Sequence, residues 1–233
     1  MRQQVAILAA GRGTRLGKPH PKPLTPLHDG NTIIGSQLAK VRDQFGDPQI
    51  YVAVGFKLEM ILEAHPEVVY VYNEAYDETN TSKSLLRVLR ATNDGGVLWM
   101  NGDVVFDAAL LALTVPLIDA GQSFVAVNTA SVADEEVKYT VDDEGWIREL
   151  SKTVTGGLGE AVGVNYVAAA DKAALLRRLD EVGAQDYFER GIELAIELDG
   201  MRVAALDISA LDAVEVDTPD DLVRANEYLR GAR

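Results

Sequence analysis

The chain has 233 residues, 47% of them hydrophobic, which is enough to bury a full core and argues against a disordered segment. Its net charge of −14 argues against a nucleic-acid-binding surface, and the absence of cysteine excludes disulfides, thiolate metal sites and a cysteine nucleophile. The longest apolar runs are far too short to span a bilayer, and the first four residues lead directly into a strand-like run. We therefore expect no signal peptide and a cytoplasmic location.

Strand-like and helix-like segments alternate in the first half of the chain. Apolar, β-branched runs predict strands at 4–9, 50–54, 68–72, 97–100 and 124–128. Helical spacing of apolar residues predicts helices at 32–45, 57–64, 82–91 and 107–120. This order predicts an α/β fold with a Rossmann-like, mostly parallel sheet that helices cover on both faces.

The second half of the chain has a different pattern. An Asp-Asp-Glu-Gly sequence at 142–145 separates two short strand-like runs, which predicts a hairpin. The predicted strands are 137–141, 146–149, 161–168, 203–207 and 213–216, and the predicted helices are 172–181, 187–198 and 219–229. Because no low-complexity linker and no internal repeat interrupts them, we expect a single domain, 1–233, whose second half adds a smaller acceptor-binding lobe.

A glycine-rich, cationic segment follows the first predicted strand. Its sequence is Leu8-Ala9-Ala10-Gly11-Arg12-Gly13-Thr14-Arg15-Leu16, and it continues with Pro21-Lys22-Pro23-Leu24. Five Lys or Arg residues and no acidic residue precede Asp29, which indicates either a local anionic ligand or a basic surface loop. A glycine-rich turn after a strand lets backbone N–H groups approach phosphate oxygens, and Arg15 and Lys22 can neutralise phosphate charge.

Two common phosphate-binding motifs do not fit this segment. A Walker A loop ends in Gly-Lys-Ser/Thr, which is absent, and a dinucleotide fingerprint needs a third glycine where Leu16 stands. The extended string, with Arg15 and Pro-Lys-Pro-Leu, resembles the signature of the sugar-1-phosphate and small-molecule nucleotidyltransferase superfamily. This resemblance implies a GT-A-like nucleotidyltransferase fold and a catalytic role for Arg15 and Lys22 at the triphosphate. It also implies nucleotide binding by Leu8, Ala9, Ala10, Gly11, Arg12, Gly13 and Thr14.

The sequence Asn101-Gly102-Asp103 ends a predicted apolar strand. Ligands of open α/β sheets bind at the carboxyl ends of strands, and a carboxylate there suits Mg²⁺. Asp103 could instead cap the next helix, although Asp107 lies nearer to the helix start. The resembling family has its first metal aspartate in a matching Gly-Asp pair, which implies that Asp103 is a magnesium ligand.

A late acidic segment, 214–221, precedes the last predicted helix. Thr218 is a suitable N-cap, Pro219 fits the first helical position, and Asp221 completes a capping-box-like pair. This leaves Asp217 without a structural task, and the resemblance implies that it is the second metal ligand. We interpret Glu215 as alternating in direction with Asp217 and assign it to the acceptor site.

The segment 79–85 opens a predicted helix with Ser, Thr and Asn side chains, a pattern that N-capping alone can explain. The corresponding loop of the resembling family contacts the nucleobase, which implies nucleotide binding by Asn80, Thr81, Ser82 and Ser84, together with Asn101 and Gly102. Most members have a Gly-Thr-Ala version that this chain lacks. The departure resembles the branch of phosphocholine and inositol-1-phosphate cytidylyltransferases and implies CTP as the nucleotide.

Two further segments are candidates for acceptor binding. Glu149 and Lys152 follow the predicted hairpin with the spacing of the cytidylyltransferase branch, which implies that Lys152 holds the acceptor's phosphate. The alternative is a surface lysine. Asp186 and Glu189 lie at a helix start, where they could face the acceptor's head group, although capping and packing also explain this segment.

These features predict a Mg²⁺-dependent transfer of CMP from CTP to a small phosphorylated alcohol or phosphonate, with release of pyrophosphate. Phosphocholine, inositol-1-phosphate and a phosphonate remain open as the acceptor. One alternative is a sugar-1-phosphate nucleotidyltransferase that uses another NTP. Others are a nucleotide-sensing protein and a GT-A-like glycosyltransferase, whose usual Asp-x-Asp motif this sequence lacks.

Overall fold

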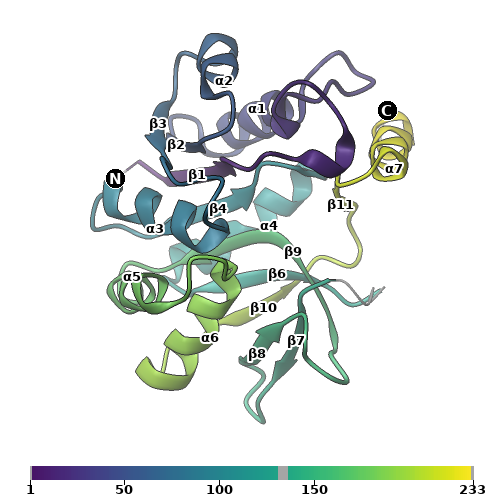
Figure 1. Cartoon of the computed structure of the whole chain (residues 1–233). Helices are drawn as coiled ribbons and strands as arrows, with labels where there is room; N and C mark the ends of the chain where they lie inside the picture. The colour runs from purple at the N-terminus through teal and green to yellow at the C-terminus, as the bar shows by residue number, and fades with distance from the viewer. Residues whose placement is uncertain (1, 131–135, 232–233) are drawn as a thin grey trace.

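The computed structural model describes residues 2–130 and 136–231, and a large mixed sheet lies at its centre (Figure 1). Neighbouring strands follow the order β10-β6-β9-β4-β1-β2-β3. Their bounds are Gln4–Ala9 (β1), Gln49–Val54 (β2), Val69–Tyr72 (β3), Val97–Asn101 (β4), Phe124–Asn128 (β6), Gly159–Val167 (β9) and Ala204–Asp207 (β10).

The sheet is parallel along the run β4-β1-β2-β3 and again between β6 and β10. The antiparallel strand β9 lies between β4 and β6. The strands β7 (Lys138–Val141) and β8 (Ile147–Ser151) form the predicted hairpin, and β7 pairs with the start of β9. The predicted α/β fold with a mostly parallel, Rossmann-like sheet is therefore confirmed.

Helices cover both faces of the sheet because its central strands are apolar on both sides. In β1, residues 5, 7 and 9 face one core cluster, which includes α1 (Ile33–Phe45), α2 (Leu58–Ala64) and α4 (Ala108–Asp119). Residues 6 and 8 face the other cluster, which includes α3 (Thr81–Ala91), α5 (Lys172–Glu181) and α6 (Phe188–Asp199). The carboxyl ends of β1 and β4 are thus held between two packed layers.

A second, small sheet lies beside the large one. The strands β5 (Val104–Phe106) and β11 (Ala213–Glu215) pair antiparallel, and α7 (Pro219–Gly231) follows them. The sequence did not predict β5, because its three apolar residues directly precede a helix. A third hydrophobic cluster joins this region to the glycine-rich segment; it contains Leu16, Leu27, Ile33, Val105, Val216 and Ala225.

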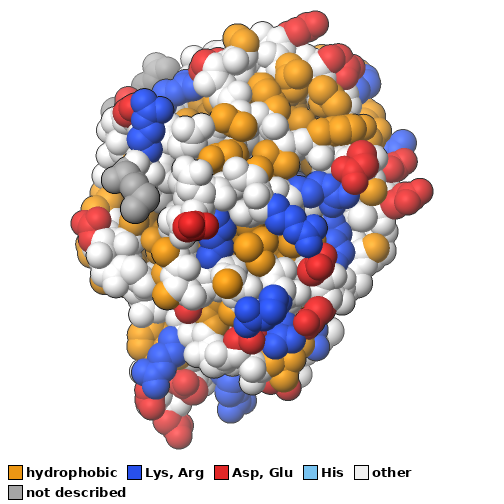
Figure 2. All heavy atoms as spheres, turned by 90° about the vertical axis from the view of Figure 1, so that its left-hand side faces the viewer, with side chains coloured by type: hydrophobic (Ala, Val, Ile, Leu, Met, Phe, Trp, Pro, Cys, Tyr) orange, Lys and Arg blue, Asp and Glu red, His pale blue; other side chains and the backbone are white. Residues whose placement is uncertain are grey.

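The surface carries charges of both signs. Figure 2 shows Lys and Arg side chains interspersed with Asp and Glu side chains on one face of the molecule. Among the described helices, none is long and apolar enough to cross a membrane.

Candidate functional site

The pairing of β5 with β11 brings three carboxylates together. Asp103 directly precedes β5, Glu215 ends β11 opposite Val104, and Val216 donates its backbone N–H to the Asp103 carbonyl at 2.9 Å. One carboxylate oxygen from each of Asp103, Glu215 and Asp217 lies within 4.8 Å of the others, and we call these residues the carboxylate cluster. Such hard oxygen donors fit Mg²⁺. Oδ1 of Asp103 is buried without a hydrogen-bond partner among the described residues, which also fits a cation.

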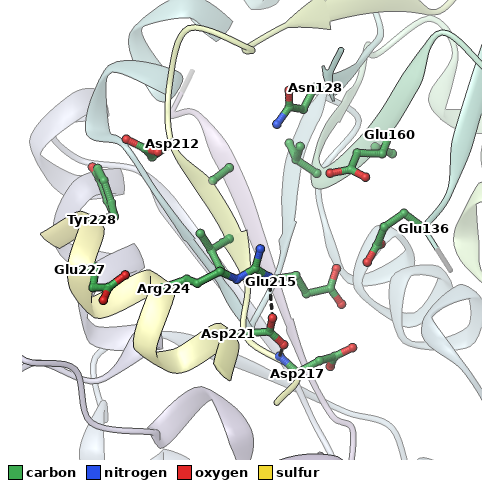
Figure 3. Close-up of a pocket in the computed structure, with 14 residues that line it drawn as sticks. Asn128, Glu136, Glu160, Asp212, Glu215, Asp217, Asp221, Arg224, Glu227 and Tyr228 are labelled. Atoms are coloured by element: carbon green, nitrogen blue, oxygen red, sulfur yellow. Dashed lines mark hydrogen bonds and ion pairs between the residues drawn. The ribbon is translucent and has the colours of Figure 1, made fainter. Parts of the chain in front are cut away.

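The prediction that Glu215 differs in direction from Asp217 is wrong. Residues two apart in an extended chain project to the same side, and both carboxylates do so in Figure 3. Burial, followed by the charges of Asp103 and Asp217, raises the pKa of Glu215 to about 8. A cation bound in the carboxylate cluster would lower this repulsion.

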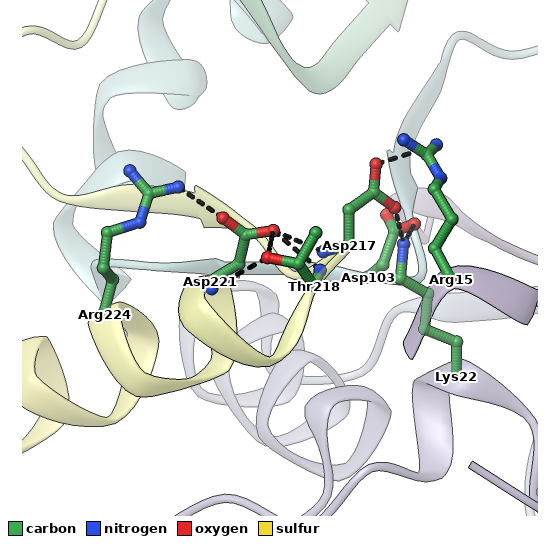
Figure 4. A network of polar contacts seen from close by, with 7 residues as sticks. All are labelled: Arg15, Lys22, Asp103, Asp217, Thr218, Asp221 and Arg224. Carbon is green, nitrogen blue, oxygen red and sulfur yellow. Dashed lines mark hydrogen bonds and ion pairs between the residues drawn. The ribbon is translucent and has the colours of Figure 1, made fainter. Parts of the chain in front are cut away.

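Two cations of the glycine-rich segment contact the carboxylate cluster (Figure 4). Nζ of Lys22 lies 2.7 Å from Oδ2 of Asp103 and also bonds Oδ1 of Asp217, while a guanidinium nitrogen of Arg15 lies 2.9 Å from Oδ2 of Asp217. Only 9% of the Lys22 side chain is exposed. Burial by itself lowers the pKa of Lys22, but the charges and hydrogen bonds of Asp103 and Asp217 outweigh it, so the net pKa is raised and the ammonium stays charged.

Two 3₁₀ turns set the positions of these cations. Arg15 lies in the turn Thr14–Leu16, and Lys22 begins the turn Lys22–Leu24. Gly13 has a φ of +56°, which favours glycine, and a Cβ added there would lie 2.7 Å from the Cβ of Lys22. Gly13 therefore lets the stem of Lys22 pack directly against the glycine-rich loop.

Gly102 sets the turn that presents Asp103. Its N–H donates to the carbonyl of Leu8 at 2.9 Å, and a Cβ added there would lie 2.8 Å from that same oxygen. The buried side chain of Gln37, in α1, donates a hydrogen bond to the carbonyl of Asn101 at 2.9 Å and so stabilises this turn. The Asp103 carboxylate is thereby fixed over the carboxyl ends of β1 and β4.

Asp221 holds the backbone of Asp217, as the predicted capping pattern requires. Its Oδ2 accepts hydrogen bonds from the backbone N–H groups of Asp217 and Thr218 at 3.1 and 2.7 Å. Just before this turn, Val216 packs in the same hydrophobic cluster as Leu16. The backbone is fixed by these contacts, and the Asp217 carboxylate is left to face the cations.

A cleft of about 900 Å³ extends from the carboxylate cluster past the carboxyl ends of β1 and β4. Segments that are far apart in the sequence line this cleft: the glycine-rich loop, the start of α3, the turn after β4, the start of α6 and the end of β11. The predicted site residues that line it are Leu8, Ala9, Gly11, Arg12, Gly13, Thr14, Arg15, Lys22, Asn80, Thr81, Asn101, Gly102, Asp103, Lys152, Glu189, Glu215 and Asp217.

The other predicted site residues do not line this cleft; they are Ala10, Ser82, Ser84, Glu149 and Asp186. Ser82 is fully buried and donates to the backbone carbonyl of Asp186 at 2.6 Å. The buried Ser84 hydroxyl accepts a hydrogen bond from Nδ2 of Asn73 at 3.0 Å. These two serines lie on the core side of α3, whereas Asn80 and Thr81 at its start face the cleft.

The two acidic residues of this group have other partners. The Asp186 carboxylate accepts the backbone N–H of Gly183 at 2.7 Å, so it closes the preceding loop and does not cap α6. Glu149 accepts a hydrogen bond from Thr140 at 2.6 Å across the β7–β8 hairpin. Ala10 is buried, with 4% of its surface exposed. The sequence pattern could not separate these local roles from ligand contacts.

A cation and a buried carboxyl lie in the part of the cleft formed by α6 and the end of β8. Nζ of Lys152 lies 5.1 Å from the ring centroid of Tyr187. Glu189 is in the first turn of α6, and its Oε2 is buried with no partner among the described residues. Burial raises the pKa of Glu189 to about 7, against the opposing effects of a backbone hydrogen bond and the Lys152 charge.

The cleft also contains residues that the sequence did not single out, among them Glu136 and Tyr76. Burial and then Glu160 raise the pKa of Glu136, and Lys152 acts in the opposite direction. One Glu among 36 acidic residues carries no sequence signal of its own. The ring centroid of Tyr76 lies 6.4 Å from that of Phe56. Tyr76 follows the parallel strand β3, and an aromatic residue after such a strand is a sequence signal for a ligand site.

A second cavity, of about 430 Å³, adjoins the carboxylate cluster (Figure 3). It shares Ala161 and four acidic residues, Glu136, Glu215, Asp217 and Asp221, with the cleft. Its further acidic lining residues are Glu160, Asp212 and Glu227. The carboxylate cluster therefore borders two spaces, of which the second is strongly acidic.

The carboxyl ends of these strands present glycine-rich backbone and two cations opposite carboxylates, an arrangement that defines an α/β domain for phosphoryl-group chemistry. Residues 5–192 match the model of the family described as the MobA-like NTP transferase domain. The chain belongs to this family, and the predicted class, a nucleotidyltransferase, is confirmed. Glu215 and Asp217 lie beyond the matched residues.

Curated relatives cover nearly the whole chain. It is 29% identical, over an alignment of 250 residues, to a CMP-5'-(3-aminopropyl)phosphonate synthase of Streptomyces rubellomurinus, with 96% of this chain and 38% of that protein covered. It is 27% identical, over 249 residues, to the bifunctional protein GlmU of Pseudomonas putida, with 99% and 51% covered. The chain thus spans about half or less of the length of these two relatives.

Solved structures share the fold. The CTP:phosphocholine cytidylyltransferase LicC of Streptococcus pneumoniae aligns with a TM-score of 0.78 at 19% identity, covering 98% of this chain and all of that one. The inositol-1-phosphate CTP transferase of T. maritima aligns with a TM-score of 0.77 at 18% identity, covering 98% and 95%. By their names, both belong to the branch that the sequence resembles.

Proposed function

We propose that this chain is a magnesium-dependent cytidylyltransferase that transfers CMP from CTP to a small phosphonate or phosphorylated alcohol and releases pyrophosphate. The observation that carries the proposal is the meeting of Arg15 and Lys22 with the carboxylates of Asp103 and Asp217 in the wall of one cleft. Mg²⁺ bound to these carboxylates would supply charge stabilisation at the phosphoryl oxygens. Three relatives whose names contain CMP or CTP support cytidine as the nucleoside.

In this proposal the acceptor brings its own nucleophile, an oxygen of its phosphate or phosphonate, so the protein needs no strong general base. That oxygen forms a bond to the α-phosphorus of CTP while the bond to the bridging oxygen breaks and pyrophosphate leaves. Gly11 and Gly13 offer backbone N–H groups to the phosphates, and Arg15 and Lys22 stabilise the charge that develops there. Asn80 and Thr81 line the cleft where α3 begins, and in this proposal they recognise the base and ribose.

We assign the acceptor to the part of the cleft that holds Lys152, Tyr187 and Glu189. Lys152 would bind the acceptor's phosphate or phosphonate. Oε2 of Glu189 is buried and has no partner in the described part of the chain, so it needs a hydrogen-bond donor, which a primary ammonium supplies and the quaternary ammonium of choline does not. This favours an acceptor that carries an amine, in keeping with the aminopropylphosphonate in the name of one relative.

Pyrophosphate release tests the proposal directly. The protein is incubated with Mg²⁺, with each of the four NTPs, and with aminoalkylphosphonates, phosphocholine, inositol-1-phosphate or a sugar-1-phosphate. We expect release with CTP and an aminoalkylphosphonate at the highest kcat/KM. No release with any pair would reject the enzymatic proposal, and a preference for another NTP with a sugar-1-phosphate would establish the alternative nucleotidyltransferase.

A further inference from the structure

Lys22 and Arg15 contact three of the four carboxylate oxygens of Asp103 and Asp217. Lys22 bonds one oxygen of Asp103 and one oxygen of Asp217, and Arg15 pairs with the second oxygen of Asp217. The fourth oxygen, Oδ1 of Asp103, is buried and without a partner among the described residues. The ammonium of Lys22 therefore lies between the two aspartates, in the position of a counter-ion (Figure 4).

We propose that Lys22 is an exchangeable counter-ion that keeps the divalent metal out of the free enzyme and admits it when a triphosphate binds. A divalent ion and an ammonium cannot share the same two carboxylate oxygens without strong repulsion. A triphosphate in the adjoining cleft offers Lys22 a new anionic partner, and its departure frees the oxygens for the metal. The proposal builds on the proposed function, since it takes the incoming anion to be a nucleoside triphosphate.

The local structure suits such an exchange. The Cβ of Lys22 packs against Gly13, so the base of the side chain stays with the glycine-rich loop that would receive the phosphates. Only the end of a flexible four-carbon stem has to move, and the ammonium is a compact charge that can change partners. Arg15 shares one carboxylate with Lys22 and lies in the same loop, so the phosphates can draw both cations away together.

This exchange predicts reciprocal coupling. If the triphosphate releases the aspartates for the metal, the metal must raise the affinity for the triphosphate by the same factor. If Lys22 had only a structural role, the outcome would differ. Its replacement would disorder the site and lower the affinity for both the metal and the triphosphate.

The test measures metal and nucleotide separately, without an acceptor and without turnover. Mn²⁺ binding to the nucleotide-free protein is followed by electron paramagnetic resonance, and CTP binding in EDTA is followed by calorimetry. Lys22→Met should bind Mn²⁺ at least tenfold more tightly than the unaltered protein and CTP at least tenfold more weakly. Lys18→Met removes an exposed lysine from the same segment and should change neither affinity. An unchanged or weaker Mn²⁺ affinity in a folded Lys22→Met protein would overturn the proposal.

A measurement on the unaltered protein covers the case in which the variant does not fold. The side-chain ¹⁵N resonance of Lys22 should shift when CTP is added in EDTA and stay in place when Mg²⁺ alone is added. A shift of equal size with Mg²⁺ alone would contradict the counter-ion role. If CTP does not bind the unaltered protein at all, the proposed function fails. The comparison of Mn²⁺ affinity between Lys22→Met and the unaltered protein still tests whether Lys22 keeps the metal out.

Discussion

Val216 donates its backbone N–H to the carbonyl oxygen of Asp103 at 2.9 Å, and this bond continues the short β5–β11 ladder to the edge of the carboxylate cluster. The ladder spans three residues on each strand, so a small change in it moves the two aspartates relative to each other. The spacing of the carboxylates is therefore a property of the β5–β11 pair, whereas the glycine-rich loop follows a strand of the large sheet.

Neutralising either aspartate should abolish most of the transfer activity. In Asp103→Asn or Asp217→Asn the cleft keeps its shape but loses a charge that the metal needs, so we expect kcat/KM to fall about a hundredfold or more. Initial rates of pyrophosphate release over a Mg²⁺ series measure this effect. Asp143→Asn, in the exposed hairpin turn, is the matched control and should retain its rate. Full activity in either aspartate variant would remove that residue from the metal site.

Replacing Lys152 should separate acceptor binding from nucleotide binding. Lys152→Met removes the cation near Tyr187, and loss of a charge-assisted hydrogen bond should raise the acceptor KM by about tenfold to a hundredfold. The KM for CTP should stay the same, because Arg15 and Lys22 remain. Steady-state kinetics with each substrate varied in turn measure both constants. An equal rise in the two KM values would argue against an acceptor-specific role.

Glu189 should make the folded protein less stable as the pH rises. Its pKa is about 7 in the folded protein against 4.5 in the unfolded chain, so its contribution to stability is fully present below about pH 4.5 and is lost as the pH rises through 7. Glu189→Gln removes this loss, and its free energy of unfolding should exceed that of the unaltered protein above pH 7 by at most about 3 kcal/mol. Urea unfolding at pH 5 and pH 8 tests this.

The control for this experiment is Glu197→Gln, which changes an exposed carboxyl on the same helix. The free energy of unfolding of Glu197→Gln should differ from that of the unaltered protein by the same amount at both pH values. If the Glu189→Gln difference is equally independent of pH, the carboxyl titrates normally in the folded protein.

Gly102→Ala should disturb the turn that carries Asp103. The added Cβ would lie 2.8 Å from the Leu8 carbonyl, so the turn has to shift, and we expect a loss of about 1–3 kcal/mol in stability together with a fall in kcat. Thermal unfolding and pyrophosphate release measure the two effects. Gly231→Ala, at the end of α7, where no atom of the described residues lies within 4 Å of the new Cβ, should leave both values near those of the unaltered protein.

Hydrophobic periodicity was enough to predict the large sheet and its covering helices. The alternation in β1, where residues 5, 7 and 9 face one core and 6 and 8 the other, is a strong signal because both faces are buried. By contrast, β5 has three residues and merges with the start of α4, so its existence depends on a partner strand more than a hundred residues away. Local pattern contains no information about that pairing.

The same distinction holds for the site. Glycine-rich and strand-end contexts, together with the resemblance to a nucleotidyltransferase signature, point to Arg15, Lys22, Asp103 and Asp217, and the structure places these residues in contact. Ser84 and Asp186 look like ligands in sequence because hydroxyls and carboxylates at helix starts serve capping, core and ligand roles alike. The predicted direction of Glu215 is wrong, although the two-residue period of an extended chain places it on the same side as Asp217. Glu136 could not be predicted, because only the tertiary fold places it in the cleft.

The contact between Lys22 and Asp217 joins residues 195 positions apart, which has a consequence for the order in which the protein matures. During synthesis Lys22 leaves the ribosome 195 residues before Asp217 does, and the helix that fixes Asp217 follows later still. The large sheet can form before α7 does, but the set of charges around Lys22 is complete only when α7 docks on Leu16 and Val216. A chain that stops before this helix keeps both aspartates that Lys22 contacts, but it lacks Asp221, whose carboxylate holds the backbone of Asp217.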